Sequence, residues 1–310
     1  MEIIRHILPH PRFSHPIVSL GNFDGVHLGH QVILNEVVRE ARVRQGTALV
    51  LTFHPHPLTV LRPDRPLPLI LSLREKLLSF LSLGIQGVFL QRFTLAFSRF
   101  TAEEFVRRYL VEAIGVEKVI IGHNVSFGYN RTGGAETLKR FGQEYGFTVE
   151  VVGPVMTAGR EVSSTAVRAV LSAGDMHEVT RLLGRHYAVS GRVEKGFQRG
   201  RGIGFPTANL RPRADLLLPN GVYAVTVNVG EENIPGVANV GVNPTFGGNG
   251  RTIEAHLFDF SADLYGQRLR VSFIERLRGE QKFPSIQELI HQIQEDANRA
   301  RVILSQSARA

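Results

Sequence analysis

The 310-residue sequence contains no cysteine and no tryptophan. The absence of cysteine excludes disulfide bonds, thiolate metal sites and thiol nucleophiles together. Any catalysis must therefore depend on histidines, carboxylates, hydroxyls and bound cofactors. No apolar run approaches membrane-spanning length, and histidine, arginine and proline interrupt the start, "MEIIRHILPHPRFSHP", where a signal peptide would be apolar. We expect a soluble, cytoplasmic protein with no membrane partner.

Lysine is also scarce, because only five of the 36 basic residues are lysines and the rest are arginines dispersed along the chain. The net charge of +8 suits either a nucleic-acid surface or a protein that handles anionic small molecules. A nucleic-acid-binding barrel predicts aromatic and basic residues interleaved on its strands. The stretches "YAVTVNV" and "IEAHLFDF" contain neither lysine nor arginine. We therefore expect small anionic ligands and no nucleic acid.

The chain is longer than one hydrophobic core usually organises, so two domains are expected. In the first part, the short apolar runs "IVSL", "ALVLTF", "GVFL" and "KVIIG" alternate with helix-period segments such as "HQVILNEVVREARVR". This pattern is typical of a parallel sheet with crossover helices. We predict an α/β domain over residues 1–184, in which "SSTAVRAVLSAGDMHEVTRLLG" is helical and Gly184 ends the helix.

Beyond residue 184 the pattern changes to alternating strands such as "HYAVSGRV", "GVYAVTVNV" and "LRVSFIERL", separated by glycine, proline and asparagine. These strands predict an antiparallel β-barrel over residues 185–310. The tail places Ile286, Leu289, Ile290, Ile293 and Ala297 at helical spacing behind Ser285 as a cap. One closing helix is expected to pack on the barrel.

The stretch "GNFDGVHLGHQ" (21–31) joins the end of a strand to the start of a helix near His27. Unpaired N–H groups at such a junction form an anion site, and His27 and His30 would project from one side of the first turn. Two imidazoles there could stabilise charge on a phosphoryl group in transfer. A metal pair and purely structural histidines remain the alternatives. A zinc pair on a helix more often has i, i+4 spacing and a third ligand.

These residues resemble the HxGH-type signature of the nucleotidylyltransferases, and the whole chain resembles the bacterial bifunctional riboflavin kinase/FAD synthetases. The match continues in family order through "TFHPHP", "GHNVSFGYNRTGG" and "VSSTAVR". The resemblance implies a Rossmann-like N-terminal domain that transfers AMP from ATP to FMN. It implies an ATP site of Gly21, Phe23, Asp24, His27, His30, Ser164, Thr165 and Arg168. Taken alone, "SSTAVR" would be a plain capped helix start.

The chain departs from the family pattern at two places. It has His54 where the family usually has an acid, and Asn124 and Val125 within a motif that is usually "GxDFxFG". A neutral Asn124 can still form hydrogen bonds with a flavin or adenine edge. The resemblance implies flavin contacts by His56, Asn124, Phe127 and Arg131. The "TFHPHP" segment could equally be a proline-stiffened loop.

The second motif is "GFQRGRGIGFPTANL" (196–210), a glycine-rich stretch that could let backbone N–H groups approach phosphates. It lacks the GK[ST] ending of a Walker loop, and read alone it could be a bulged hairpin. "GFPTANL" resembles the PTAN signature of riboflavin kinases. That resemblance implies Mg²⁺ ligation by Thr207 and Asn209, whose oxygens suit a hard cation that shares the nucleotide phosphates. The implied ATP contacts are Gly196, Arg201, Gly202, Gly204, Thr207 and Asn209.

Phosphorylation of the ribityl 5′-hydroxyl benefits from a base, and the family's glutamate matches Glu254 in "TIEAHLFDF". The alternative is a solvated strand carboxylate, and Asp259 and Asp263 are expected at the surface. Further implied flavin contacts are Asn243, Thr245 and Arg278. We expect a two-step enzyme that converts riboflavin to FMN and FMN to FAD with ATP and Mg²⁺. The alternative hypothesis is that the protein has only one of the two activities and that its other domain is regulatory.

Overall fold

The computed structural model describes residues 1–5, 13–65, 67–195, 204–212, 216–242 and 251–307. Its contacts divide the chain into two compact units, one of residues 1–67 and 73–163 and one of residues 68–72 and 164–310. The boundary after residue 184 stays a prediction of the sequence. Residues 164–183 group with the second unit because the two helices they form pack on each other and the second of them contacts barrel strands.

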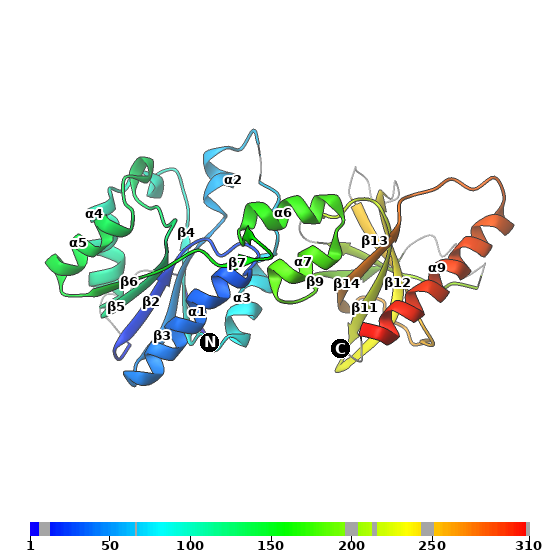
Figure 1. Ribbon diagram of the computed structural model, residues 1–310, viewed down its shortest axis with the longest axis horizontal. Helices are drawn as coiled ribbons and strands as arrows, with labels where there is room; N and C mark the ends of the chain where they lie inside the picture. Colours follow the sequence, from blue (N-terminus) through cyan, green and yellow to red (C-terminus); the bar gives the residue numbers. More distant parts are fainter. Residues whose placement is uncertain (6–12, 66, 196–203, 213–215, 243–250, 308–310) are drawn as a thin grey trace. The chain divides into compact units, whose positions relative to one another are not determined.

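The first unit contains a six-stranded parallel sheet (Figure 1). Its strands are β1 (Glu2–Ile4), β2 (Pro16–Leu20), β3 (Thr47–His54), β4 (Gly87–Arg92), β5 (Lys118–Gly122) and β6 (Thr148–Val152), in the order β1-β4-β3-β2-β5-β6. The predicted α/β fold is thereby confirmed. The strand order reverses between β2 and β5, and in open parallel sheets ligands bind at the carboxyl ends of strands beside such a reversal.

Helices cover both faces of this sheet. They are α1 (Leu28–Val43), α2 (Pro57–Leu61), α3 (Leu73–Ser82), α4 (Ala102–Phe105), the π-helix η2 (Val106–Ile114) and α5 (Ala135–Tyr145), with short 3-10 turns η1 (Phe97–Arg99) and η3 (Tyr129–Arg131). All of β2 is buried: Val18 and Leu20 pack with Phe105 and Leu110, while α1 lies against β2, β3 and β5. A hairpin of β7 (Met156–Thr157) and β8 (Arg160–Glu161) completes the unit.

The second unit begins with α6 (Ser164–Ala173) and α7 (Met176–Leu183). The sequence indicated one helical stretch, but Gly174 adopts a left-handed φ of +76° and Asp175 caps α7 by accepting a hydrogen bond from the backbone of Glu178. A glycine in that conformation ends a helix. The predicted stop at Gly184 is confirmed, because this residue is the left-handed C-cap of α7.

The predicted antiparallel barrel is confirmed, and it closes in the order β10-β13-β12-β11-β14-β9. Its strands are β9 (Tyr187–Glu194), β10 (Ala208–Pro212), β11 (Gly221–Val229), β12 (Glu232–Val242), β13 (Arg251–Leu257) and β14 (Arg268–Arg278). Tyr223 and Phe273 pack edge to face and are fully buried. Along each strand, successive side chains point in turn to this core and to the outer face of the barrel.

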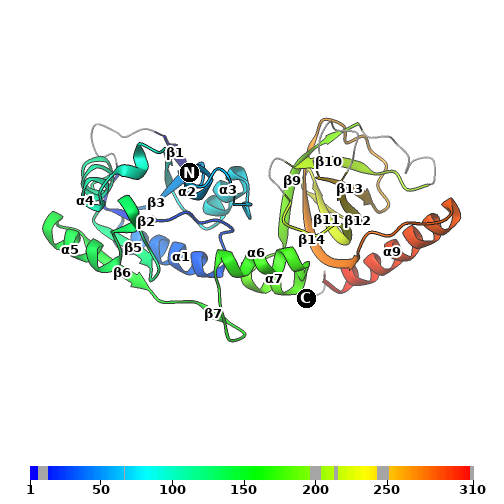
Figure 2. The same cartoon turned by 90° about the horizontal axis from the view of Figure 1, so that it is seen from above.

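Helix α9 (Ile286–Ser307) lies along the outside of the barrel (Figure 2). Ala297, Ala300 and Leu304 pack on an apolar patch of the barrel that includes Val222 and Val237. Ser285 caps the helix, as predicted, by accepting a hydrogen bond from the backbone of Glu288. The prediction was wrong for Ile286, which is 64% exposed at the first position of α9.

Candidate active sites

The loop between β2 and α1 carries the first site. His27 is the N-cap of α1, and its Nδ1 accepts a hydrogen bond of 3.3 Å from the backbone N–H of His30. Nδ1 of His27 is therefore unprotonated, and the ring proton lies on Nε2. The helix starts where the sequence predicted, and the positive end of its dipole makes this end attractive to an anion.

The two imidazoles lie against each other. The ring centroids of His27 and His30 are 3.6 Å apart at 19°, and the edge of Phe23 packs on His30 at 5.2 Å. A side chain at Gly29 would meet the His27 ring at 3.2 Å and the carbonyl oxygen of Val162 at 3.3 Å. Any side chain at Gly29 would press on the His27 ring, so glycine favours the packing of the two histidines, and the structure brings the predicted pair together.

The metal interpretation of this pair finds little support. The described residues hold no group of three or more histidine, aspartate or glutamate side chains placed to bind a metal ion. Nδ1 of His27 is already used by the helix cap. A donor Nε2 on His27 suits a phosphate oxygen better than a cation, so this geometry favours the phosphate interpretation.

The other predicted residues of the first unit lie on separate segments. His56 caps α2, because its Nδ1 accepts from the backbone of Leu58, and Arg131 donates to Ser126 Oγ at 2.9 Å. Phe127 is 8% exposed and packs on Phe105. His56 and Phe127 thus have evident structural roles. Their flavin contacts, and those of the exposed Asn124, stay predictions.

Ser164, Thr165 and Arg168 lie in the first two turns of α6. The Nε of Arg168 donates to the carbonyl oxygen of Pro68 at 2.9 Å, which holds the 68–72 segment on the helix. Thr165 is exposed and Ser164 half-buried. The contact of these three side chains with ATP stays a prediction.

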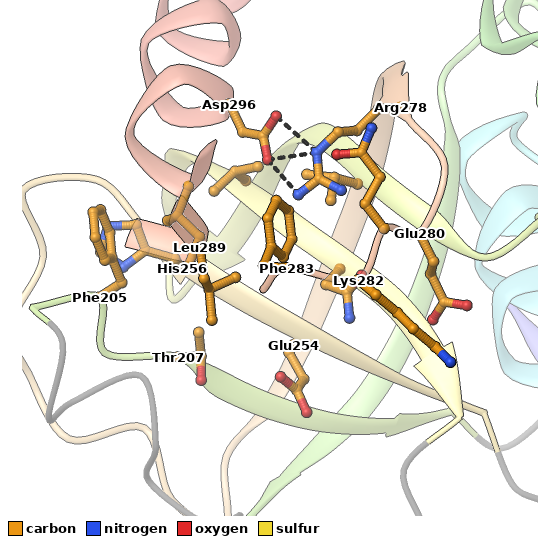
Figure 3. A pocket seen from close by; sticks show the side chains of 15 residues that line it. Phe205, Thr207, Glu254, His256, Arg278, Glu280, Lys282, Phe283, Leu289 and Asp296 are labelled. Atoms are coloured by element: carbon orange, nitrogen blue, oxygen red, sulfur yellow. Dashed lines mark hydrogen bonds and ion pairs between the residues drawn. The ribbon is translucent and has the colours of Figure 1, made fainter. Parts of the chain in front are cut away.

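The second site is a cavity of about 680 Å³ on the outer face of the barrel, bordered by α9 and the 279–283 segment (Figure 3). Its polar lining includes Thr207, Asn239, Glu254, His256 and Glu280. Apolar walls come from the barrel and from α9, which contributes two residues of the predicted apolar face. The apolar residues that line the cavity are Phe205, Val222, Val237, Phe283, Leu289 and Ile293. Such a mixed lining is typical of a site for a ring system with a polar tail.

Strand register aligns three polar residues beside this cavity. Glu254 on β13 is the partner of Asn209 on β10 and of Asn239 on β12. Directly opposed residues of paired strands place their side chains on the same face, about 5 Å apart at Cβ. Because Ile253 and Ala255 are fully buried in the barrel core, Glu254 between them faces outward to the cavity. The structure therefore brings Glu254 and Asn209 together, as their predicted roles require.

His256 connects the two motifs of the barrel. Its Nδ1 donates to the carbonyl oxygen of Pro206 at 2.9 Å, and its ring packs against the edge of Phe205 at 5.4 Å. The Pro206–Thr207 segment is thereby fixed to the strand that carries Glu254. Figure 3 shows Thr207 and Glu254 on the same side of the cavity.

Arg278 lines the cavity, but its donors are engaged within the protein. Its Nε and Nη2 bind Asp296 of α9 at 2.9 Å and 2.8 Å, and Nη1 donates to the carbonyl oxygen of Gly279. Arg278 therefore joins the barrel to α9, and its flavin contact stays a prediction. Gly204 is exposed with a φ of +88°. The predicted contacts Gly196, Arg201, Gly202, Asn243 and Thr245 lie outside the described residues.

Sequence reasoning missed Asn239, His256 and Glu280 in the cavity, and Lys76 beside the first site. The i, i+2 spacing of Glu254 and His256 on a strand was a usable signal, because such residues share a face. Glu280 and Asn239 lie in the stretches "RLRGEQKF" and "NVGVNPTFGG", which resemble family segments around the nucleotide and flavin, but neither residue was singled out.

Comparisons with known proteins identify a family for each part of the chain. Residues 11–166 match the FAD synthetase family and residues 183–304 the riboflavin kinase family. The chain is 38% identical over 304 residues to the bifunctional riboflavin kinase/FMN adenylyltransferase of Escherichia coli K12, covering 97% of each chain. It is 38% identical over 312 residues to the protein of that name from Pseudomonas fluorescens, covering 99% of each.

A solved structure shares the complete fold. The crystal structure of a protein described as a macrolide-efflux protein from Streptococcus pneumoniae has a TM-score of 0.86 and 31% identity, over 97% of this chain and 99% of that chain. Among the described residues, no helix is long and apolar enough to cross a membrane. On the family matches and the near-complete coverage of its relatives, this chain belongs to the bifunctional riboflavin kinase/FMN adenylyltransferase family.

Proposed function

We propose that two separate sets of side chains carry the two activities of this flavin-synthesising enzyme. In the barrel, Glu254, Thr207 and Asn209 serve the phosphorylation of riboflavin by ATP. In the first unit, His27 and His30 serve the transfer of AMP from ATP to FMN. The observation that carries the proposal is the alignment of Glu254 with Asn209 beside a cavity that Thr207 also lines.

In the kinase reaction, Glu254 accepts the proton of the ribityl 5′-hydroxyl as that oxygen attacks the γ-phosphorus of ATP, and ADP leaves as the bond from the γ-phosphorus to the bridging oxygen breaks. A carboxylate at hydrogen-bonding distance from the nucleophile is the usual base of such a transfer. The apolar walls of the cavity suit the isoalloxazine ring.

The residues beside Glu254 fit a magnesium ion. The hydroxyl of Thr207 and the amide oxygen of Asn209 are hard oxygen donors, and Mg²⁺ bound with nucleotides takes few protein ligands and keeps several waters. The ion would neutralise charge on the ATP phosphates during transfer. Thr207 and Asn209 would hold the ion, and the hydrogen bond from His256 to Pro206 keeps the segment of Thr207 in place.

In the AMP transfer, a phosphate oxygen of FMN attacks the α-phosphorus of ATP, and pyrophosphate leaves. The N-terminus of α1 and the Nε2 proton of His27 offer donors to phosphate oxygens. No covalent intermediate is needed. The protein contributes positioning and charge stabilisation to this displacement, which are the main sources of rate in phosphoryl transfer.

The direct test incubates the purified protein with riboflavin, ATP and Mg²⁺ and separates FMN from FAD by chromatography. We expect FMN first and FAD later, and neither product after chelation of the metal. FMN without FAD would contradict the assignment of AMP transfer, and accumulation of neither would contradict both. Because ATP is the donor in both steps, we also propose a cytoplasmic location.

Thr207→Val should raise the Mg²⁺ concentration needed for half-maximal FMN formation by about 10-fold, because a hydroxyl ligand is replaced by a methyl group of similar size. Thr207→Ser keeps the hydroxyl and should remain near the wild-type requirement. Thr226→Val is the matched control, since Thr226 lies on β11 and does not line the cavity. An unchanged magnesium requirement in Thr207→Val would remove Thr207 from the metal site.

A further inference from the structure

Lys76 is a buried lysine on α3 beside the first site. The residue is 9% exposed. Its Nζ donates to the carbonyl oxygen of Asn22 at 3.1 Å, to Thr52 Oγ1 at 3.1 Å and to the carbonyl oxygen of Phe53 at 3.5 Å. Asn22 opens the loop after β2, and Thr52 and Phe53 belong to the end of β3. One ammonium group thus connects the carboxyl ends of two neighbouring strands.

The loop that Lys76 contacts is strained. Phe23, Gly25 and Val26 have φ values of +50°, +89° and +41°. For a β-branched residue such as Val26 this conformation is a true outlier, and it persists only where surrounding contacts enforce it. Two side chains donate hydrogen bonds to the ends of the loop: Lys76 to the carbonyl oxygen of Asn22 and Gln31 to the carbonyl oxygen of Val26. Between these points lies the buried Asp24.

The charge of Lys76 is costly in this environment. Burial lowers its pKa to about 8, and the nearby Asp24 carboxylate opposes that shift. The Lys76 charge also acts on His54, whose pKa is lowered mainly by burial and to a smaller extent by Lys76 and Arg5. An apolar side chain here would avoid the desolvation cost, but it would donate no hydrogen bond to the carbonyl oxygen of Asn22 or to the end of β3.

We propose that Lys76 is a positioning residue for AMP transfer, whose ammonium group holds the 21–27 loop in the strained shape that places Asp24 and the His27–His30 pair. This inference rests on the proposed role of the two histidines. Lys76 acts through the loop, because its three contacts are with protein atoms of the loop and β3. The barrel reaction does not depend on it.

The test measures FAD formation from supplied FMN and FMN formation from riboflavin in Lys76→Met and Lys76→Arg. Lys76→Met should lower kcat/KM for FAD formation by about 100-fold, the size of loss that a misplacement near 1 Å causes. FMN formation should stay within twofold of wild type. Lys76→Arg keeps a cation and should retain more FAD formation than Lys76→Met.

Lys118→Met is the matched control. Lys118 is also a largely buried lysine of the first unit, with a side chain 13% exposed and ion pairs of 2.8 Å and 2.7 Å to Glu40 and Glu150. It lies at the start of β5, at the opposite end of the strands from the loop. Its replacement should lower the unfolding temperature without a specific loss of FAD formation. An equal loss of FAD formation in both methionine variants would overturn the proposal.

A pH profile separates positioning from simple packing. In the wild type, kcat/KM for FAD formation should fall as the pH rises through about 8, because Lys76 loses its proton there. The second ionisation of a phosphate group has a pKa near 6, so it is complete below that pH and does not cause the fall. Lys76→Met should show a low rate without this fall. A wild-type profile that is flat through the same range would contradict the proposed role of the charge.

His30→Ala distinguishes this proposal from the assignment of the site. If His30→Ala loses FAD formation while folded Lys76→Met keeps it, the positioning role of Lys76 fails and the histidine site stands. If both variants keep FAD formation, the proposed site itself is wrong. Circular dichroism and urea unfolding of each variant establish that the first unit is folded.

Discussion

Glu254→Gln should lower FMN formation from riboflavin by about 1,000-fold, within the range lost when a general base is removed. The amide has the shape of the carboxylate but cannot accept the proton of the ribityl hydroxyl at neutral pH. FAD formation from supplied FMN should be unchanged, because that reaction is assigned to the other unit. Steady-state kinetics of the two half-reactions measure both effects in one preparation.

Substitutions of two other glutamates test whether the loss is specific to Glu254. Glu280 also lines the cavity, where its Oε2 accepts a hydrogen bond from Asn220 at 3.0 Å, and it is the rival base. Glu275 on β14 pairs with Arg299 and does not line the cavity. We expect Glu280→Gln to lose less activity than Glu254→Gln, and Glu275→Gln to lose none. A larger loss in Glu280→Gln would transfer the role of base to Glu280.

The parallel sheet and the barrel could be predicted because their strands carry local signals. A strand such as β2, buried on both faces, is an unbroken apolar run, and a strand such as β13 alternates between core and outer face. The start of α1 near His27 also followed from the glycine-rich turn before an apolar helical pattern, although the capping role of His27 did not.

The cavity could not be predicted in the same way, because its wall is assembled from residues far apart in sequence. Asn209, Glu254 and Asn239 become neighbours only through the register of β10, β13 and β12. The interaction of Arg278 with Asp296 is likewise settled by where α9 lies on the barrel. The role of Lys76 depends on three backbone and hydroxyl contacts that leave no pattern in the sequence.

His30→Ala should lower FAD formation from FMN by about 100-fold, comparable to the loss of one donor from a preorganised anion site. FMN formation should persist. The loss of packing on Phe23 is a competing cause, which His30→Phe tests, because it keeps an aromatic ring beside Phe23 but offers no donor. His15→Ala is the control of the same residue type, since His15 pairs with Glu117 before β2 and β5 begin.

Two substitutions of His27 can separate its role as the helix cap from its proposed role as a hydrogen-bond donor to phosphate. His27→Ala removes the Nδ1 acceptor that caps α1 and should destabilise the first unit by about 1 kcal/mol. His27→Asn keeps a capping oxygen, so it should preserve stability but lose the Nε2 donor. If the histidine is only structural, His27→Asn will form FAD at the wild-type rate. If it binds phosphate, His27→Asn and His27→Ala will lose FAD formation alike, although only His27→Ala unfolds at a lower urea concentration.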